Sequence, residues 1–383
     1  MKRKNENLRV LFLSYYNLNY GMGASASLLD LLMDMPSQIC SIIIEPKRID
    51  LPYINVEVPA NVERKIIPIP LKKTISVVLY PFLAFFFSLK ILCTLRPIVI
   101  ISMHHPHHPL SLVGHIISTI FRIPHIVDVR DVWRPLKSKL TIVDYLVDGL
   151  ERFVTKFIKN DLIIFVCSEH KRILEKRSKV IFKRYLVIPN CVSYTILRNI
   201  NIRRKVSHSR KIKFIYVGRV AAEYALDKIF PLLDELSSLG YEPVLTILGH
   251  TEVKIPTKYK VFIKRLPRRE TLKMIAESDV GIGPMKSVLT IPRKVVEYLV
   301  LKKAIVAGRG AISRDILLRF RNYIIEYSEK TDPRELAQKL LLLLRNNVWK
   351  KNYITKRNDE LEFLFCKHKV KTILREILKM YKR

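Results

Sequence analysis

Cysteine is scarce in this chain of 383 residues, and it is not arranged in close pairs. The cysteines are odd in number, widely scattered and without a C-x-x-C pair: Cys40, Cys93, Cys167, Cys191 and Cys366. Close pairs are typical of structural zinc sites, and even, regularly spaced sets are typical of disulfide frameworks. The sequence therefore predicts neither kind of site and favours a reducing, cytoplasmic setting.

A long uncharged apolar run is also missing. Residues 1–17 begin with basic side chains, but the apolar run that follows is short and lacks a small-residue cleavage site, so we expect no signal peptide. The most apolar segment, Ile75–Leu95, follows Lys73, contains Lys90 and is interrupted by Pro81. Its uncharged part is shorter than the ~20 residues of a spanning helix. We expect a buried or interfacial helix there.

Acidic residues are outnumbered: 34 Asp and Glu face 68 Lys and Arg, which gives a net charge of +34. Such a charge predicts attraction to nucleic acid, an anionic membrane surface or phosphorylated substrates. Nucleic acid is the weakest of the three, because the chain shows no basic–aromatic interleaving and no recognition motif. The opposing interpretation is that the charge reflects composition alone and that 75–95 is a core helix.

Strand-like and helical patterns alternate along the whole chain, which predicts an α/β fold with parallel sheets. The polar, aperiodic segment 197–211 divides two such series. We therefore predict two doubly wound, Rossmann-like domains facing a cleft, over 1–196 and 212–358. A C-terminal helix over 359–383 could pack back on the first domain.

Ligands of such sheets bind beyond the carboxyl ends of the strands, so residues that follow strands are the candidates. Gly218 and Arg219 follow one strand, and Arg219, helped by Lys228, is suited to a diphosphate because guanidinium bonds two oxygens at once. The alternative for Arg219 is an ordinary surface arginine.

Another candidate is the helix that begins near Pro292, where free amide groups and Lys294 suit an anion. Glu297 lies about one and a half turns further and could accept hydrogen bonds from two vicinal ribose hydroxyls. The alternative is a helical salt bridge of Glu297 with Arg293 or Lys294.

The histidine cluster "HHPHHP" begins with His104 and His105 and follows another strand. Four histidines around a proline do not complete a tetrahedral metal shell without other ligands, and no acidic or cysteine partner is spaced nearby. We therefore expect no metal there and place His104 and His105 on the acceptor side of a cleft.

Several segments in order resemble the family 4 glycosyltransferases, which have the two-domain GT-B fold. They are "YGMGASAS" (20–27), "IVDVRDVW" (126–133), "FVCSEHKRIL" (165–174), "VIPNCV" (187–192), "YVGRVAAEYALDKI" (216–229) and "PRKVVEYLVLKKAIVAG" (292–308). The resemblance covers nearly the whole chain. Its "DVRD" segment is similar to a subgroup with an aspartate-x-arginine-aspartate-x-tryptophan pattern.

The resemblance implies metal-independent, retaining transfer of a sugar from a nucleotide-diphosphate sugar, with no cofactor. It assigns Arg219 to the diphosphate and Glu297 to the ribose, and it places Gly21 and Gly23 against the phosphates. Arg130, with Asp131, stands where many relatives have a histidine near the reacting sugar. The alternative for Arg130 and Asp131 is a local salt bridge.

Two positions depart from the family pattern. Tyr224 stands where relatives often have a lysine, and Leu289 where they commonly have a glutamate that touches the donor sugar. An inactive, nucleotide-binding relative is therefore an alternative to an enzyme. For an enzyme, the predicted partners are a nucleotide-sugar donor and a glycan or polyprenyl-linked acceptor, at the inner face of the cell membrane.

Overall fold

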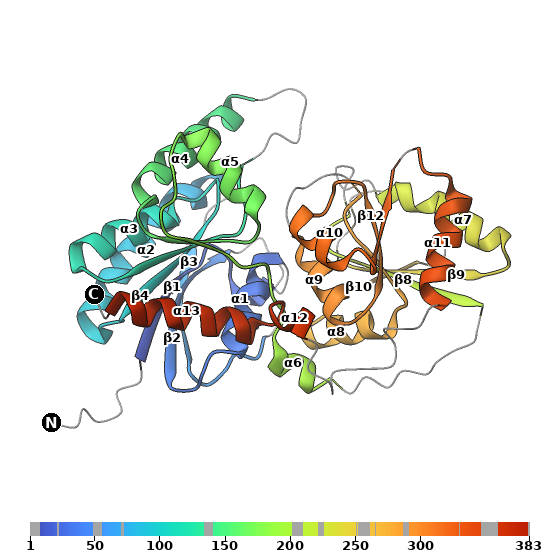
Figure 1. Ribbon diagram of the computed structural model, residues 1–383. Helices are drawn as coiled ribbons and strands as arrows, with labels where there is room; N and C mark the ends of the chain where they lie inside the picture. The colour runs from blue at the N-terminus through green and yellow to red at the C-terminus, as the bar shows by residue number, and fades with distance from the viewer. Residues whose placement is uncertain are drawn as a thin grey trace. The chain divides into compact units, whose positions relative to one another are not determined.

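The computed structural model describes residues 8–20, 23–48, 56–69, 73–133, 141–200, 210–220, 226–249, 251, 261–264, 266–285, 291–328, 330–345 and 359–381. The chain forms two compact units (Figure 1): Met1–Pro189 with Lys367–Arg383, and Asn190–Cys366. The passages between the units therefore fall at 189–190 and 366–367, rather than after 196 and 358 as the sequence predicted. Most of the predicted linker, 201–209, lies outside the described residues.

The first unit contains a seven-stranded parallel sheet with strand order β3-β2-β1-β4-β5-β6-β7. Its strands are β1 (Leu8–Leu13), β2 (Ile39–Arg48), β3 (Val62–Ile69), β4 (Val99–His104), β5 (His125–Val129), β6 (Leu162–Phe165) and β7 (Tyr185–Val187). Every residue of β4, β5 and β6 is buried, as expected for parallel strands covered on both faces. The predicted α/β class with parallel pairing is confirmed.

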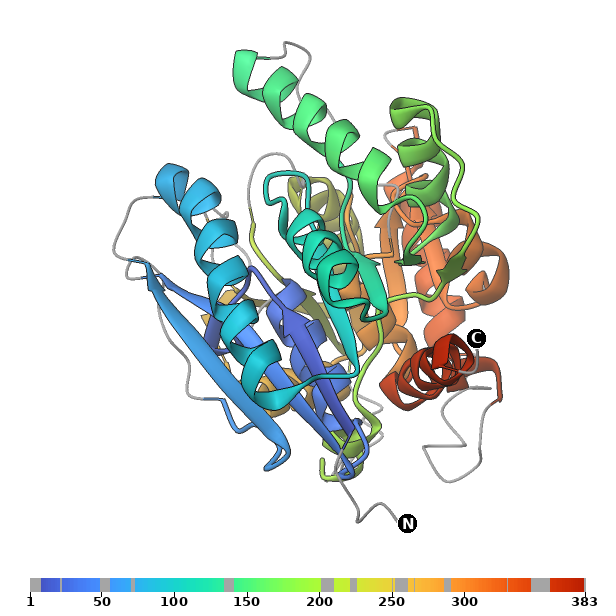
Figure 2. The same cartoon turned by 90° about the vertical axis from the view of Figure 1, so that its left-hand side faces the viewer.

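Helices α2, α3 and α4 lie side by side over this sheet (Figure 2). The helices that begin in this part of the chain are η1 (Leu18–Tyr20), α1 (Gly23–Met33), α2 (Lys73–Leu95), α3 (Leu110–Phe121), α4 (Ile142–Ile158), α5 (Ser168–Ser178) and, near the C-terminus, α13 (Cys366–Tyr381). From α13, Val370, Ile373 and Ile377 join the core cluster of the first sheet. Their helical spacing explains why this face of α13 is buried there.

The apolar segment 75–95 forms part of α2, and this helix continues through Pro81 instead of ending there. Proline has no backbone N–H, so Pro81 removes one hydrogen-bond donor from the helix. The residues on both sides of it are nevertheless helical. Tyr80 and Ala84 are buried against the sheet, whereas Phe82 and Phe86 are exposed. Among the described residues, no helix is long and apolar enough to cross a membrane.

The second unit contains a six-stranded parallel sheet with order β10-β9-β8-β11-β12-β13. Its strands are β8 (Lys211–Val217), β9 (Glu242–Leu248), β10 (Val261–Lys264), β11 (Val280–Ile282), β12 (Ala304–Gly308) and β13 (Ile324–Tyr327). Its helices are α6 (Tyr194–Arg198), η3 (Leu226–Ile229), α7 (Phe230–Ser238), α8 (Arg268–Glu277), α9 (Arg293–Val300), α10 (Arg314–Phe320), α11 (Pro333–Arg345) and α12 (Asp359–Glu362). Helices α7 and α11 pack together on one face, with α8 and α9 on the other (Figure 1).

Cys191 and Cys366 form a disulfide across 175 residues of sequence. The prediction of unpaired cysteines is therefore wrong at these two positions, whereas Cys40, Cys93 and Cys167 are free. Spacing along the chain misled the prediction because the C-terminal segment returns to the segment after β7. There the Val192 amide donates to the Leu364 carbonyl at 3.0 Å, and the Cys366 amide donates to the Val192 carbonyl at 3.0 Å.

Candidate functional site

Helix α9 carries the glutamate that the sequence singled out. Pro292 is its N-cap residue, with an extended backbone (φ −60°, ψ 135°), and the first residue of the helix is Arg293. From Val295 to Val300 every side chain is buried, including that of Glu297. A buried carboxylate needs compensating partners, so the contacts of Glu297 decide its role.

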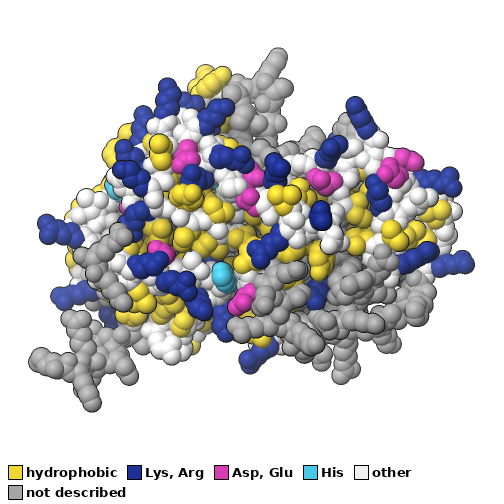
Figure 3. Space-filling view, viewed as in Figure 1, with side chains coloured by type: hydrophobic (Ala, Val, Ile, Leu, Met, Phe, Trp, Pro, Cys, Tyr) yellow, Lys and Arg dark blue, Asp and Glu magenta, His cyan; other side chains and the backbone are white. Residues whose placement is uncertain are grey.

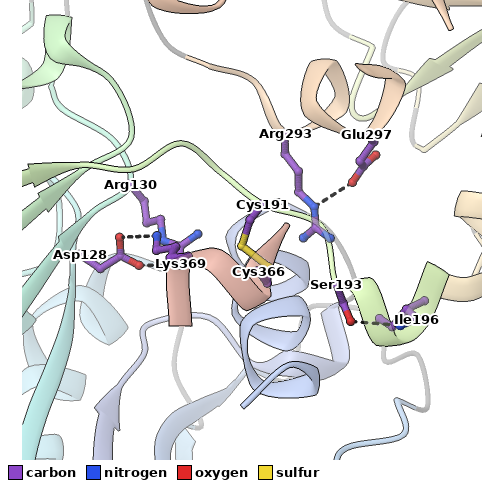
Figure 4. Close-up of a disulfide and its surroundings, with 9 residues drawn as sticks. All are labelled: Asp128, Arg130, Cys191, Ser193, Ile196, Arg293, Glu297, Cys366 and Lys369. Atoms are coloured by element: carbon purple, nitrogen blue, oxygen red, sulfur yellow. Dashed lines mark hydrogen bonds and ion pairs between the residues drawn. A yellow bond between two sulfur atoms is a disulfide. The ribbon is translucent and has the colours of Figure 1, made fainter. Parts of the chain in front are cut away.

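Two arginines hold one oxygen of the Glu297 carboxylate. Arg268 of α8 donates from Nη1 to Oε1 at 2.7 Å, and Arg293 donates from Nε to the same Oε1 at 2.8 Å (Figure 4 shows the second contact). The other oxygen, Oε2, is buried and has no hydrogen-bond partner among the described residues. The helical salt bridge that was the alternative to ribose binding is thus present, but it occupies only half of the carboxylate.

Lys294 brings the start of α9 to the end of β8. Its Nζ lies 3.5 Å from the centroid of the Tyr216 ring, a cation–π geometry. A Cβ at Gly218 would lie 3.4 Å from the same nitrogen, so the missing side chain of Gly218 leaves the backbone open beside it. Burial lowers the pKa of Lys294 to about 7, against the opposing effect of Glu297. The structure thereby places Gly218 and Lys294, both predicted for the donor phosphates, next to each other.

Tyr298 fixes the register of α9 on the sheet. Its hydroxyl donates to the Ile215 carbonyl at 3.2 Å and accepts from the Val217 amide at 3.1 Å. Below it, a Cβ at Gly281 would lie 2.3 Å from the Tyr298 ring, so only glycine fits. Glu297 and Lys294, which precede Tyr298 in the same helix, are therefore held at a defined height above the carboxyl ends of the strands.

Arg219 directly follows Gly218 and is exposed, and the Tyr216 hydroxyl donates to the Arg219 carbonyl at 2.9 Å. Lys228 lies in η3 and is partly buried. The role of both side chains at the diphosphate stays a prediction. Gly21, Tyr224 and Leu289 lie outside the described residues, and Gly23 begins α1 with a positive φ of 57°.

The histidines of the cluster in the first unit differ in burial. His104 is buried, with Nδ1 2.9 Å from the Ser111 hydroxyl and Nε2 3.5 Å from Glu151 Oε1. His105 is partly buried, and its ring lies 4.7 Å from that of Tyr15. Burial and the neighbouring histidines hold the pKa of His105 well below its ordinary value. The expected acceptor contact of His104 and His105 stays a prediction.

Arg130 is placed by a buried charge cluster at the end of β5. Its Nη2 donates to Asp128 Oδ2 at 2.5 Å, and Lys369 of α13 donates from Nζ to Asp128 Oδ1 at 3.2 Å. Burial acts to raise the pKa of Asp128, but Arg130 and Lys369 together lower it below its ordinary value. Asp131 is exposed, and its Oδ1 accepts from the Val132 amide at 2.9 Å.

Among the described residues, one group could approach a metal ion: His115, His125 and Asp161. Both histidines direct Nδ1 to Asp161 Oδ2, at 2.9 Å and 3.0 Å, and the Ser102 hydroxyl lies 2.7 Å from His125 Nε2. His125 begins β5 and Asp161 directly precedes β6, so the group lies at the amino ends of the strands. It satisfies its own hydrogen bonds and is remote along the strands from Arg130.

The sequence did not identify Arg268, Asp128 or Lys369. Arg268 lies 29 residues from its partner Glu297 in the sequence, and Lys369 lies 241 residues from its partner Asp128. Only the folded chain brings each pair together. Asp128 stands in the quoted "DVRD" segment, where its place in an otherwise apolar strand was the only signal.

No protein-family model matches the chain, and no curated protein matches it in sequence. Solved structures do match over its full length. Sucrose-phosphate synthase from Thermosynechococcus elongatus is 12% identical, with a TM-score of 0.64 over 97% of this chain and 100% of that one. WaaG, a glycosyltransferase involved in lipopolysaccharide biosynthesis, is 13% identical, with a TM-score of 0.61 over 95% of each chain. UDP-GlcNAc 2-epimerase from Neisseria meningitidis is 9% identical, with a TM-score of 0.58 over 97% and 100%. At this identity the likeness shows the architecture, and the chain has the GT-B fold.

Proposed function

We propose that this protein is a retaining glycosyltransferase that moves a sugar from a nucleotide-diphosphate sugar to a glycan or polyprenyl-linked acceptor. The observation that carries the proposal is the half-occupied carboxylate of Glu297. Two arginines fix Oε1, whereas Oε2 is buried without a partner among the described residues. An unpaired buried acceptor costs about 1–3 kcal/mol, so its retention favours a ligand that donates to it, such as a ribose hydroxyl.

The groups around Gly218 suit the diphosphate of the same ligand. The amide end of α9 and Lys294, in its protonated form, supply positive charge beside an open backbone, and Arg219 directly follows Gly218. In the transfer, the bond between the sugar C1 and the diphosphate oxygen breaks while the acceptor oxygen attacks from the same face. The acceptor proton passes to the leaving phosphate oxygen, and the cationic groups stabilise the charge that develops there. The proposed transfer requires no metal ion.

The test begins with binding. We expect nucleoside diphosphates to raise the melting temperature of the protein, because a ligand at about 100 times its Kd stabilises the native state by about 2.7 kcal/mol. Uridine, guanosine and adenosine diphosphates and their sugar conjugates serve as the panel. If none of them shifts the melting temperature, the proposal fails.

Product analysis separates the reaction classes. NMR of the product should show the anomeric configuration of the donor, in buffer with and without a chelator. Inversion would overturn the retaining mechanism, and loss of turnover with chelator would overturn metal independence. Conversion of the donor without acceptor would instead favour a hydrolase or an epimerase, and an epimerase is among the proteins of similar structure. Binding without any turnover would favour the inactive relative.

The finer part of the proposal is that the enzyme works at an anionic membrane surface, and helix α4 supports it. Its exposed side carries a stripe of apolar residues at helical spacing: Ile142, Tyr145, Leu146, Phe153 and Phe157. Arg152, Lys156 and Lys159 flank the later part of this stripe and are also exposed. In the view of Figure 2, the start of α4 extends beyond the helices beside it. Lys and Arg also outnumber acidic side chains on the face in Figure 3.

We expect this stripe to insert between lipid headgroups. Changing Leu146 to glutamate and Phe153 to serine should lower binding to vesicles of phosphatidylglycerol and phosphatidylcholine about tenfold or more, since each buried side chain contributes about 1.5–3 kcal/mol. Sedimentation with vesicles measures this. Leu318→Ser on α10 is the matched control, because Leu318 is 68% exposed and Leu146 67%. Equal binding of both variants would contradict the membrane proposal.

A further inference from the structure

The last helix of the chain contributes a buried cation to the first unit. The side chain of Lys369 is 1% exposed, and those of Asp128 and Arg130 are 4% and 7% exposed. One carboxylate thus lies between two cations, with one oxygen toward each (Figure 4). The three charges leave a net charge of one positive at the carboxyl end of β5.

The position of Lys369 is fixed along α13. Cys366, the first residue of α13, is bonded to Cys191, and Lys369 follows one turn later. Val370 and Ile373 pack into the core of the first sheet, and near the end of the helix the Tyr381 hydroxyl donates to the Ile98 carbonyl. A helix that packs along its buried face and is bonded near its end to the first sheet presents its lysine in one place.

We propose that Lys369 is a positioning residue that acts through Asp128 to orient Arg130 and to keep its positive charge available to an anionic group of the substrate. The inference rests on the proposed function, in which Arg130 lies near the reacting sugar. With Lys369 present, Asp128 divides its negative charge between two cations. Without it, the carboxylate neutralises Arg130 alone and leaves its own Oδ1 unpaired in a buried place.

The titration of Lys369 offers a direct signal. Burial has the largest effect on its pKa and lowers it, Asp128 raises it, and Arg130 lowers it further. The resulting pKa is about 8, compared with an ordinary value of 10.5. Above about pH 8 Lys369 loses its proton, and we expect the support of Arg130 to fade. Stability should move the other way. Between about pH 8 and 10.5 the unfolded chain binds more protons at this lysine than the folded one, so this group makes the fold more stable as the pH rises.

The experiment compares Lys369→Met and Lys369→Arg with the wild type, using the pH dependence of kcat and KM. We expect kcat of the wild type to fall above about pH 8. Lys369→Arg should keep most of the activity and lose this fall, because arginine stays charged. Lys369→Met should lower kcat about 100-fold, as expected for a misplaced group, and show no fall near pH 8. Binding of nucleoside diphosphate should be the same in all three proteins.

Lys303→Met is the matched control. Lys303 is also a fully buried lysine, but its Nζ donates to the carbonyls of Ala276 and Ser278 at 2.5 Å and 2.8 Å in the second unit. This variant should lose stability and retain the fall in kcat near pH 8. If Lys369→Met also retains that fall, or if its kcat equals that of the wild type, the inference is overturned.

A spectroscopic readout keeps the inference separate from the proposed function. The Nε–Hε resonance of Arg130, assigned from its absence in Arg130→Lys, should shift with a midpoint near pH 8 in the wild type and not in Lys369→Met. A midpoint unaffected by Lys369→Met would overturn the inference, whatever the activity. Absence of nucleotide binding by the wild type would instead overturn the proposed function, and the Arg130 resonance would still decide the role of Lys369.

Discussion

Glu297→Gln is expected to remove the ability of this protein to distinguish a ribose from a sugar that lacks the 2′ and 3′ hydroxyls. A hydrogen bond to a charged group contributes about 1.5–3 kcal/mol. The wild type should therefore bind a nucleoside diphosphate at least about tenfold more tightly than its 2′,3′-dideoxy counterpart. In Glu297→Gln this ratio should fall to about threefold or less. Calorimetric titration of both ligands against both proteins measures the four affinities.

The ratio matters because Glu297→Gln also disturbs the fold. The side chains of Arg268 and Arg293 are only 8% and 10% exposed, and removing the charge they share destabilises the second unit. Asp161→Asn is the control. It removes a carboxylate that contacts two buried or partly buried histidines, and it lies in the first unit, at the amino ends of the strands. It should lower stability and leave the ribose ratio intact. An unchanged ratio in Glu297→Gln would contradict ribose binding by Glu297.

Most of the fold follows from local sequence patterns. Apolar runs bounded by polar turns predict all six strands of the second sheet, because each run is short and nearly uniform and most of them are followed by a helical period. In the first sheet, β2 and β3 did not stand out. Pro46 and Pro68 and several charged side chains interrupt their apolar runs, and only the pairing of the two strands with each other and with β1 makes them strands.

Only some residues of the candidate site could be predicted. Those that could not be predicted are recognised by partners that lie far away in the sequence. Glu297, Lys294 and Gly218 were singled out because each stands next to a recognisable strand end or helix start. Arg268 and Lys369 were not found, since nothing near them along the chain indicates an acidic partner. In a chain with 68 basic residues, the sequence does not indicate which single lysine or arginine lies beside a buried carboxylate in the folded protein.

The disulfide was missed for the same reason, and its removal should have a large effect on stability. Cys191→Ser with Cys366→Ser is expected to lower the free energy of unfolding by about 2–5 kcal/mol, because the bond closes a loop of 175 residues in the unfolded chain. At about 2–4 °C per kcal/mol, the melting temperature should fall by about 5–20 °C. Scanning calorimetry, with and without a dithiol reductant, measures this.

The controls use the remaining cysteines. Cys93→Ser should melt like the wild type, because Cys93 is exposed and free. In the unfolded, unreduced protein, alkylation and mass spectrometry should find three reactive thiols out of five cysteines. Five reactive thiols without reductant would contradict the disulfide, as would a double variant that melts like the oxidised wild type.

The same double variant also tells whether the disulfide acts on the unfolded chain alone or also on the site. The backbone hydrogen bonds between Val192 and the segment before α13 do not depend on the sulfur atoms. If these bonds suffice to place α13, the double variant should be less stable and still lose kcat above about pH 8, as Lys369 requires. If the fall in kcat becomes shallow together with the loss of stability, the disulfide also holds Lys369 against Asp128. Measuring the pH profile well below the lowered melting temperature separates these two results, because the folded protein alone is then sampled.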